Sequence, residues 1–425
     1  MSKSTADLYK IFLQSTGVCT DTRTLKKGQL FFALKGPNFN GNAYAEKALD
    51  MGASFAIIDK EAFDGGDKYL LVRDVLKALQ ELSTHHRDQF EIPILGITGS
   101  NGKTTTKELL ARILSSKFKV HFTKGNLNNH IGVPLTLLAM SKNTDFAIIE
   151  MGANHLGDIA ELCQLAKPTH GMITNIGSAH LGEFGGRENL IRAKSELFDY
   201  LRKTDGVVFI NTEDEVLHNM AKRFSNAILY PNKTCQLVVA DPYVNYKDLM
   251  EEEHATQLIG AYNFMNISAA ITISQFFEVD NLYEPIDRYV PDNNRSEILE
   301  IGSNKVVLDA YNANPSSMEA ALENLVQMKG EKKIALLGEM KELGEYSLEE
   351  HKKIVRLADQ LGVNTTFWVG NEFIIATDNK DSCFENVDDL IKFLGKKPFS
   401  GTTVLIKGSR SVQMEKLTEA KELWT

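Results

Sequence analysis

Short apolar runs alternate with longer amphipathic stretches along most of this chain. The runs are Ser54–Asp59, Pro93–Thr98, Asp145–Glu150, Gly171–Ile176, Gly206–Ile210, Val306–Ala310, Lys333–Leu337, Thr365–Val369 and Thr403–Lys407. Runs this apolar are typical of strands that are covered by other elements on both faces. Because helical segments of about ten or more residues separate them, the pattern predicts βαβ units and an α/β fold with mostly parallel sheets.

Two positions interrupt this alternation and predict domain boundaries. A helical pattern over Leu76–Arg87 ends near Gln89–Pro93, just before a buried strand begins. The second interruption, Glu284–Ser296, holds two prolines and a cluster of polar turn residues. The chain of 425 residues is long enough for three domains of roughly 150 residues each. We therefore expect domains over 1–88, 89–290 and 291–425.

The composition narrows the class of protein. Hydrophobic residues make up 43% and charged residues 24% of the chain, which indicates a folded globular protein. The formal net charge of −9 argues against a nucleic-acid partner, whose binding surfaces are normally basic. Four widely spaced cysteines without a CxxC pair support neither a disulfide framework nor a zinc knuckle.

The sequence predicts neither a signal peptide nor a membrane helix. The first residues lack the apolar core of a signal peptide, and no run approaches the roughly 20 apolar residues of a membrane helix. We therefore expect a cytoplasmic protein with no membrane insertion.

The strongest local signal is a glycine-containing loop between a predicted strand and a predicted helix, within Ile94–Glu108. Its residues are Gly99, Ser100, Asn101, Gly102, Lys103, Thr104 and Thr105. Glycines let backbone N–H groups approach phosphate oxygens, and the N-terminus of the helix adds a positive dipole. Lys103 would then reach the β- and γ-phosphates of ATP, and the Thr104 hydroxyl would hold Mg²⁺. The common pattern has glycine where Ile97 stands, so a tight turn with an exposed lysine is the alternative.

Three further residues are candidates for metal binding and chemistry near these phosphates. Glu150 ends an apolar strand, so it is either a Mg²⁺ ligand at the ligand-binding edge of the sheet or a carboxylate facing water. His180 follows another strand in a glycine-rich loop and could bind a metal, although a lone histidine is more often structural. Lys194 lies on a predicted helix, and its position alone gives no reason to choose it over any solvated lysine.

Polar residues later in the chain suit the base and ribose of a nucleotide. Asn263 and Asn266 share one face of a predicted helix and could pair with an adenine edge, but Asn263 is also a candidate N-cap. Asp309 ends a strand and could bind ribose hydroxyls or cap a helix. Asn314 and Pro315 are typical of the N-cap and first residue of a helix.

Taken in order, the motifs of this chain resemble those of the Mur ligase family. The matching segments, which cover nearly the whole chain, are TGSNGKTTTKE, NLNNHIGVPLTLL, EMGANHLGDI, NIGSAHLGEFGG, AKSELF, DAYNANPSSM, LGEMKELG and KGSRS. The resemblance implies a three-domain Mur ligase architecture. It consists of a small UDP-substrate-binding domain, a central P-loop ATPase domain and a Rossmann-like C-terminal ligase domain.

The resemblance also implies an activity. The segments EMGAN and YNANP favour the member that joins D-alanyl-D-alanine to UDP-N-acetylmuramoyl-tripeptide during peptidoglycan precursor synthesis. ATP would phosphorylate the terminal carboxylate of the tripeptide, and the amine of the dipeptide would attack the acyl phosphate. Two alternatives stay open: a ligase of the same fold that adds a single amino acid, of third-residue or polyglutamate type, and a nucleotide-binding regulatory ATPase. We expect the protein to act as a monomer.

The functional residues of the family fall on particular positions of this sequence. Those for ATP and Mg²⁺ are the loop residues 99–105 with Glu150, His180, Lys194, Asn263, Asn266, Arg295 and Asp309. Those expected near the substrates are Asp21, Thr22, Arg23, Lys35, Gly36, Asn126, Asn128, Asn129, Lys407 and Ser409. Among the first group, Lys103, Thr104 and Glu150 resemble the phosphate and Mg²⁺ residues, and His180 resembles a second metal ligand. Lys194 resembles a lysine that these ligases carry as N6-carboxylysine, a carbamate whose anionic oxygens suit Mg²⁺.

Overall fold

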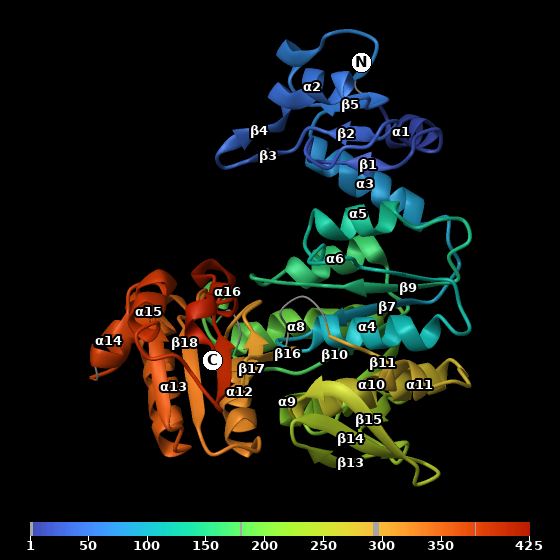
Figure 1. Ribbon diagram of the computed structural model, residues 1–425. Coiled ribbons are helices and arrows are strands. Elements are labelled where there is room, and N and C mark those ends of the chain that lie inside the picture. Colours follow the sequence, from blue (N-terminus) through green and yellow to red (C-terminus); the bar gives the residue numbers. More distant parts are fainter. Residues whose placement is uncertain (1–2, 179–180, 292–296, 379) are drawn as a thin grey trace.

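The computed structural model describes residues 3–178, 181–291, 297–378 and 380–425 of the chain. Figure 1 shows an N-terminal lobe, a central lobe and a C-terminal lobe, each built on its own sheet with helices packed on it. The predicted α/β fold is therefore confirmed, while the predicted domain limits stay a prediction. Within these residues no helix combines the length and the apolar character that crossing a bilayer requires.

The N-terminal lobe has a small parallel sheet with the strand order β1-β2-β5-β6. Its strands are β1 (Val18–Cys19), β2 (Leu30–Phe32), β5 (Phe55–Ile58) and β6 (Tyr69–Leu71), beside a hairpin of β3 (Lys35–Gly36) and β4 (Phe39–Asn40). Its helices are α1 (Thr5–Phe12), α2 (Ala45–Asp50) and α3 (Val75–Arg87), with the 3-10 helices η1 (Gly41–Tyr44) and η2 (Glu61–Phe63). Residues of α1 and α3 pack in one apolar cluster with β2 and β5, which gives this lobe its own core.

The central lobe has a parallel sheet with the order β12-β11-β10-β7-β9-β8. Its strands are β7 (Ile94–Thr98), β8 (Val120–Phe122), β9 (Phe146–Glu150), β10 (His170–Ile173), β11 (Val207–Asn211) and β12 (Ile228–Tyr230). Its helices are α4 (Lys103–Leu114), α5 (Gly132–Leu138), α6 (Asp158–Ala166), α7 (Leu181–Phe184), α8 (Arg187–Lys203), α9 (Glu215–Ala221), α10 (Tyr262–Phe276) and α11 (Glu284–Asp287).

The side chains of β9 explain why this sheet is covered on both faces. Phe146 and Ile148 belong to the apolar cluster that includes α4 and α10, whereas Ala147 and Ile149 belong to the cluster that includes α5, α6 and α8. Successive strand residues point to opposite faces, so an unbroken apolar run is buried by helices on both sides. All the strand residues of β7 and β9 are buried, as the apolar runs predict.

A second sheet in the central lobe differs from the expected parallel pattern. It is antiparallel and consists of β13 (Cys235–Ala240), β14 (Tyr243–Asp248) and β15 (Glu253–Ile259). These strands alternate buried and exposed residues or are largely exposed, because the sheet packs against helices on one face only. They therefore lack the long apolar runs that mark the strands of the parallel sheet.

The C-terminal lobe has a sheet with the order β16-β17-β21-β18-β19-β20. Its strands are β16 (Glu297–Ile301), β17 (Asn304–Asp309), β18 (Lys333–Gly338), β19 (Thr365–Val369), β20 (Cys383–Phe384) and β21 (Thr403–Lys407), and only the β16–β17 pair is antiparallel. Its helices are α12 (Pro315–Gln327), α13 (Ser347–Gln360), α14 (Asn371–Ala376), α15 (Val387–Leu394) and α16 (Lys416–Glu419), with 3-10 helices η3 (Gly344–Tyr346), η4 (Lys380–Ser382), η5 (Arg410–Val412) and η6 (Lys421–Leu423). Asn314 caps α12 and Pro315 is its first residue, so this prediction is confirmed.

Candidate active site

The glycine-containing loop of residues 99–105, called the phosphate loop below, leads from β7 into α4 at the carboxyl edge of the central sheet. Gly99 and Gly102 have φ angles of +142° and +80°, which residues with a Cβ rarely adopt. A Cβ on Gly99 would overlap the hydroxyl of Thr174, and one on Gly102 would overlap the side-chain oxygen of Asn266. Helix α4 begins at Lys103 without a side-chain cap, so the N–H groups of its first turn suit an anion. The loop therefore fits a phosphate group.

Lys103 lies over this loop. Its Nζ donates hydrogen bonds to the carbonyl oxygens of Gly99 at 2.6 Å and Ser100 at 3.1 Å. The loop is fixed from behind by Asn175, which accepts from the N–H of Ser100 at 3.0 Å and from the N–H of Asn101 at 3.0 Å. Lys103 is therefore held at the loop, contrary to the alternative of an exposed lysine beside a simple turn.

Glu150 is the centre of a buried polar cluster at the end of β9. Its Oε2 accepts a hydrogen bond from Thr104 Oγ1 at 3.0 Å and lies 3.4 Å from Lys107 Nζ, while its Oε1 accepts from Asn128 Nδ2 at 2.8 Å. Glu150 is only 2% exposed, so the alternative of a carboxylate facing water is wrong. The 3.0 Å between the Thr104 and Glu150 oxygens matches two neighbouring ligands of an octahedral Mg²⁺ with bonds of about 2.1 Å. The pair therefore fits a magnesium ion.

Lys194 lies inside the protein, on the apolar face of α8, and is 2% exposed. Its Nζ lies 5.5 Å from the centre of the Phe184 ring. Burial and, to a smaller extent, the positive charge of Lys103 together lower the pKa of Lys194 to about 7. A solvated lysine is therefore the wrong interpretation of this residue. The sequence does hold a signal, because Lys194 stands four residues after Leu190 and three before Leu197, on the buried stripe of the helix.

Asn263 and Asn266 lie in α10, behind the phosphate loop, and both are buried. Asn266 accepts a hydrogen bond from Thr106 Oγ1 at 3.1 Å and donates to Asn263 Oδ1 at 2.8 Å, and Asn263 donates to the carbonyl of Ile259 at 2.8 Å. The N-cap of α10 is Ala261, so the alternative that Asn263 is the cap is wrong. This chain of hydrogen bonds supports α4 from behind, and contact of either asparagine with adenine stays a prediction.

Asp309 and Lys407 end adjacent strands of the third sheet and contact each other. Lys407 Nζ lies 2.5 Å from Asp309 Oδ2, and the lysine is 1% exposed. Ser409 follows Lys407 and accepts a hydrogen bond from the N–H of Lys341 at 3.0 Å. Asp309 is therefore neutralised by a buried cation rather than capping a helix, and the roles of these residues towards ribose and substrate stay predictions.

Residues of the C-terminal lobe reach the phosphate loop. Asn101 Nδ2 donates to Ser316 Oγ at 2.8 Å, and Asn314 Nδ2 donates to Asn101 Oδ1 at 2.9 Å. Ser316 also accepts from the N–H of Ser178 at 3.4 Å. The N-terminal end of α12 thus docks on the loop that fits a phosphate.

Sequence reasoning missed two residues that hold this site together. Lys107 was not singled out, but it is 1% exposed and pairs with Glu150. Its signal is its place four residues after Lys103 on a helix whose same face is otherwise apolar or hydroxylic. Ser316 directly follows the Asn314–Pro315 capping pair, and no local pattern indicates that its hydroxyl binds Asn101 of another lobe.

The predicted substrate residues of the N-terminal lobe differ in exposure and in their contacts. Arg23 makes a two-pronged ion pair with Asp21, and this hydrogen-bonded arginine lowers the pKa of Asp21 to about 2. Lys35 in β3 lies 2.7 Å from the buried carboxylate of Asp59. Thr22 is buried, and Gly36 faces the ring of Phe39 across the hairpin.

In the central lobe, the predicted substrate asparagines differ in their surroundings. Asn126 is exposed, Asn128 binds Glu150, and Asn129 Oδ1 accepts from the N–H groups of Ile131 and Gly132 at the start of α5. Of these three asparagines, Asn128 is therefore the one in contact with a candidate metal ligand, Glu150.

A cavity of about 1080 Å³ lies between the N-terminal and central lobes. Its walls include Cys19, Thr20 and Thr24, which flank the Asp21–Arg23 segment, and Leu127, which lies between the candidate asparagines. Neighbours of two segments that the family resemblance places near one substrate therefore border one cavity. Of the other predicted residues, Thr105 is half-buried on α4, and His180 and Arg295 lie outside the described residues.

Three family models match the chain, and together they cover most of it. The Mur ligase family catalytic domain matches residues 14–87, the Mur ligase middle domain matches 97–274, and the Mur ligase glutamate ligase domain matches 294–410. The chain therefore belongs to the Mur ligase family and is an ATP-dependent ligase.

Particular members of this family are similar over nearly their whole length. The UDP-N-acetylmuramoyl-tripeptide–D-alanyl-D-alanine ligase of Bacillus subtilis (strain 168) is 32% identical, over 95% of this chain and 92% of that protein. The ligase of the same name from Synechocystis is 36% identical, over 94% of this chain and 90% of that protein. The crystal structure of the MurF ligase from Thermotoga maritima in complex with ADP has a TM-score of 0.86 and 27% identity, covering 97% of this chain and 98% of that one.

Proposed function

We propose that this chain joins D-alanyl-D-alanine to UDP-N-acetylmuramoyl-tripeptide at the cost of one ATP. The observation that carries the proposal is the contact of Asn101 in the phosphate loop with Asn314 and Ser316 of the third lobe. A ligase must bring an activated acid and an amine together, and this contact brings a phosphate site to the lobe that the resemblance assigns to the amine. Relatives named for this reaction are similar over more than 90% of their length.

We propose that the loop of residues 99–105 binds the phosphates of ATP, with Lys103 offsetting their charge. Thr104 and Glu150 would hold Mg²⁺, a role supported by the 3.0 Å spacing of their side-chain oxygens. On the family resemblance, His180 would be a further metal ligand, and Asn263, Asn266, Arg295 and Asp309 would lie near the base and ribose.

For Lys194 we propose N6-carboxylation. The neutral amine would add to carbon dioxide, forming an N–C bond and releasing one proton. A buried ammonium beside Lys103 is unfavourable, whereas a carbamate there would be attracted to Lys103 and would offer oxygens to Mg²⁺. The lowered pKa supports the proposal, because it makes the reactive neutral amine available near neutral pH.

The cavity between the first two lobes is the proposed site of the UDP-linked substrate. It is large enough for a substantial part of such a ligand, and its walls include Cys19, Thr20 and Thr24 beside the Asp21–Arg23 segment and Leu127 beside the candidate asparagines. Lys35 and Gly36 lie in the neighbouring hairpin of the same lobe. From this cavity the peptide would extend towards Glu150, which Asn128 contacts.

In the proposed reaction ATP supplies the phosphoryl group that makes the peptide carboxylate an acyl phosphate. Lys103 then lies where two anions meet, and the docked third lobe limits access of water to the acyl phosphate. The amine of D-alanyl-D-alanine attacks the acyl carbon, and phosphate leaves. Lys407 and Ser409, at the edge of the third sheet, are proposed to orient the dipeptide. We further propose that the domains span 1–88, 89–290 and 291–425 and that the chain works as a cytoplasmic monomer.

The test measures phosphate release and the mass of the product with ATP, defined UDP-N-acetylmuramoyl-tripeptides and one amine at a time. We expect an amide product with D-alanyl-D-alanine and much less with any single amino acid. A product formed only with a single amino acid would identify a different ligase of the fold. Phosphate release that needs no amine, with no amide formed, would identify a nucleotide-binding ATPase.

A further inference from the structure

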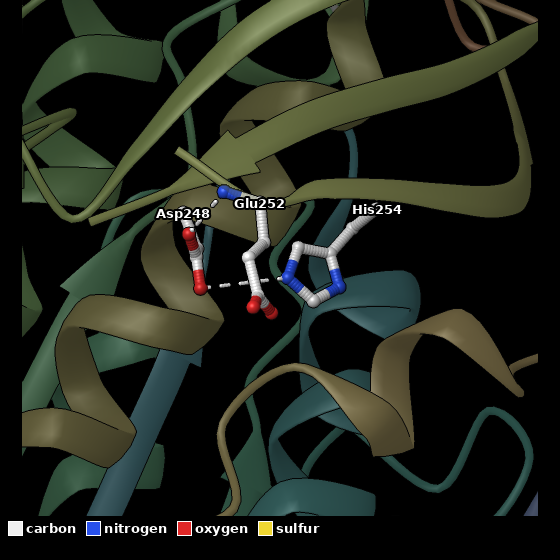
Figure 2. A group of neighbouring side chains, drawn as sticks. All are labelled: Asp248, Glu252 and His254. Carbon is white, nitrogen blue, oxygen red and sulfur yellow. Dashed lines mark hydrogen bonds and ion pairs between the residues drawn. The ribbon is translucent and has the colours of Figure 1, made fainter. Parts of the chain in front are cut away.

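The turn between β14 and β15 carries three side chains that converge on one point. They are Asp248 at the end of β14, Glu252 in the turn and His254 in β15, and their ligand atoms all lie within 4.8 Å of one another. Figure 2 shows the two carboxylates and the imidazole pointing towards each other from the same side of the hairpin. None of the three belongs to the candidate active site.

The turn itself is fixed by one oxygen of Asp248. Its Oδ1 accepts from the N–H groups of Met250 at 2.8 Å and Glu252 at 2.9 Å. The other oxygen, Oδ2, lies 3.7 Å from His254 Nε2, and the side chain of Asp248 is only 6% exposed. One carboxylate oxygen therefore holds the backbone, and the other is directed towards the histidine.

His254 is oriented as a metal-binding histidine would be. Its Nδ1 lies 2.8 Å from Asp287 Oδ2, so Nδ1 carries the proton and donates it to this carboxylate. Its Nε2 is buried and has no hydrogen-bond partner among the described residues. The ring lies between Tyr246 and Tyr283, at centroid distances of 5.1 Å and 4.9 Å, which prevents it from turning towards water. A histidine whose other nitrogen binds a carboxylate is a common arrangement around protein metals.

The local charge also favours a cation. Three carboxylates, those of Asp248, Glu252 and Asp287, surround the imidazole. Lys247 of the hairpin pairs with Glu251, which is not one of the three converging side chains. When the proton of His254 is on Nδ1, the lone pair of Nε2 faces carboxylate oxygens, and the two repel each other. A metal ion between them would attract both.

We propose that Asp248, Glu252 and His254 form a binding site for a divalent transition metal, with zinc as the best fit. One imidazole nitrogen and two carboxylate oxygens are a ligand set that zinc accepts, with water as the fourth ligand. Ligands of a tetrahedral zinc lie about 3.3 Å apart, close to the 3.7 Å that separates Asp248 from His254. The exposed Glu252 can close the remaining distance.

Such an ion would fasten the hairpin to the helix beside the phosphate loop. Asp287 ends α11, and α11 packs against both β15 and α4. Its neighbour Tyr289 also donates a hydrogen bond to Glu108 of α4 at 2.6 Å. The site is therefore structural and lies apart from the residues proposed for catalysis.

Equilibrium dialysis of the whole protein against ZnCl₂, with magnesium in excess to occupy the ATP site, tests the proposal. We expect one zinc per chain in the wild type, and binding at least roughly tenfold weaker in Glu252→Gln and His254→Gln. Glu251→Gln is the matched control, because Glu251 lies in the same turn but outside the cluster. Zinc should raise the Tm of the wild type and of this control, but not that of Glu252→Gln.

Two results would overturn the proposal. One is the absence of stoichiometric zinc in the wild type, which would leave His254 as a side chain held in place by Asp287. The other is equal zinc binding by the wild type and Glu252→Gln. Since Glu252 is exposed, this variant is expected to fold and decides the matter even where His254→Gln does not fold.

Discussion

Asn101 of the phosphate loop and Asn314 of the C-terminal lobe are joined by a hydrogen bond of 2.9 Å between their side-chain amides. Ser316 adds a second bond to Asn101, at 2.8 Å. Asn314 also caps α12, so the start of this helix and its contact with the loop depend on the same residue. The position of the third lobe is therefore tied to the conformation of the phosphate loop.

Removing the Ser316 hydroxyl should weaken this connection without unfolding the lobe. In Ser316→Ala we expect kcat/KM to fall roughly fivefold, because the hydrogen bond to Asn101 that is lost should be worth about 1 kcal/mol in the docked state. The measurement is the rate of phosphate release with both substrates present. Ser317→Ala is the matched control, because Ser317 completes the capping box inside the lobe and should lower stability with less effect on kcat/KM. Equal kinetic effects in the two variants would contradict the docking role of Ser316.

Lys103→Met should remove turnover, since this side chain is held where the phosphate charge must be offset. We expect kcat to fall at least about a hundredfold, as when one charge-stabilising donor is lost. The rate of ADP formation is the measurement, and Lys119→Met, on an exposed lysine of the same lobe, is the control. A rate near that of the wild type would rule out the phosphate-binding role.

Gly182→Ala should hinder docking of the third lobe. A Cβ on Gly182 in α7 would overlap the backbone of Leu343 and Gly344 in the C-terminal lobe. We expect a fall in kcat/KM of at least about tenfold, since backbone overlap is relieved only by movement of the lobe, together with weaker ADP binding. Nucleotide titration and steady-state kinetics on the same preparation separate the two effects. An unchanged kcat/KM would mean that this contact is dispensable.

The unmodified Lys194 should make stability depend on pH. Its pKa is about 7 in the folded protein and 10.5 when unfolded, so between these values the unfolded chain binds more protons and stability rises with pH. In buffer freed of carbon dioxide, the free energy of unfolding should increase by about 2 kcal/mol more for the wild type than for Lys194→Met between pH 7.5 and 9.5. Urea unfolding at the two pH values measures this difference. Parallel pH profiles for the two proteins would contradict the lowered pKa.

A carboxylated Lys194 should be replaceable by a small anion. In Lys194→Ala we expect activity to be low and to recover in part with added formate or acetate, because a carboxylate can occupy the place of the carbamate oxygens. Chloride at the same ionic strength is the control. Recovery with chloride, or none with any carboxylate, would argue against the carbamate.

Features that depend on neighbouring residues in the sequence could be predicted. The apolar runs located the strands β7 and β9, and the Asn314–Pro315 pair located the start of α12, because burial on two faces and helix capping leave local patterns. The antiparallel strands β13–β15 left a weaker pattern, since only one face of that sheet is covered.

The contacts that assemble the site could not be predicted in the same way. Lys107 pairs with Glu150 and Asn101 with Asn314 across long separations in sequence, and no local signal specifies such partners. Lys194 is intermediate. Its place on the apolar stripe of α8 is a local signal of burial that the prediction of a solvated lysine overlooked, whereas its nearness to Lys103 depends on how the lobe folds.

Asn101 belongs to the phosphate loop and also contacts Asn314 and Ser316 of the C-terminal lobe, so docking of this lobe and nucleotide binding are thermodynamically linked. If docking of α12 on Asn101 strengthens nucleotide binding by some free energy, then nucleotide binding stabilises the docked position of α12 by the same free energy. This equality does not depend on the order of the two events. An effector that pulled α12 away would thus loosen ATP from a distance, and a nucleotide analogue that distorts residue 101 would release the third lobe.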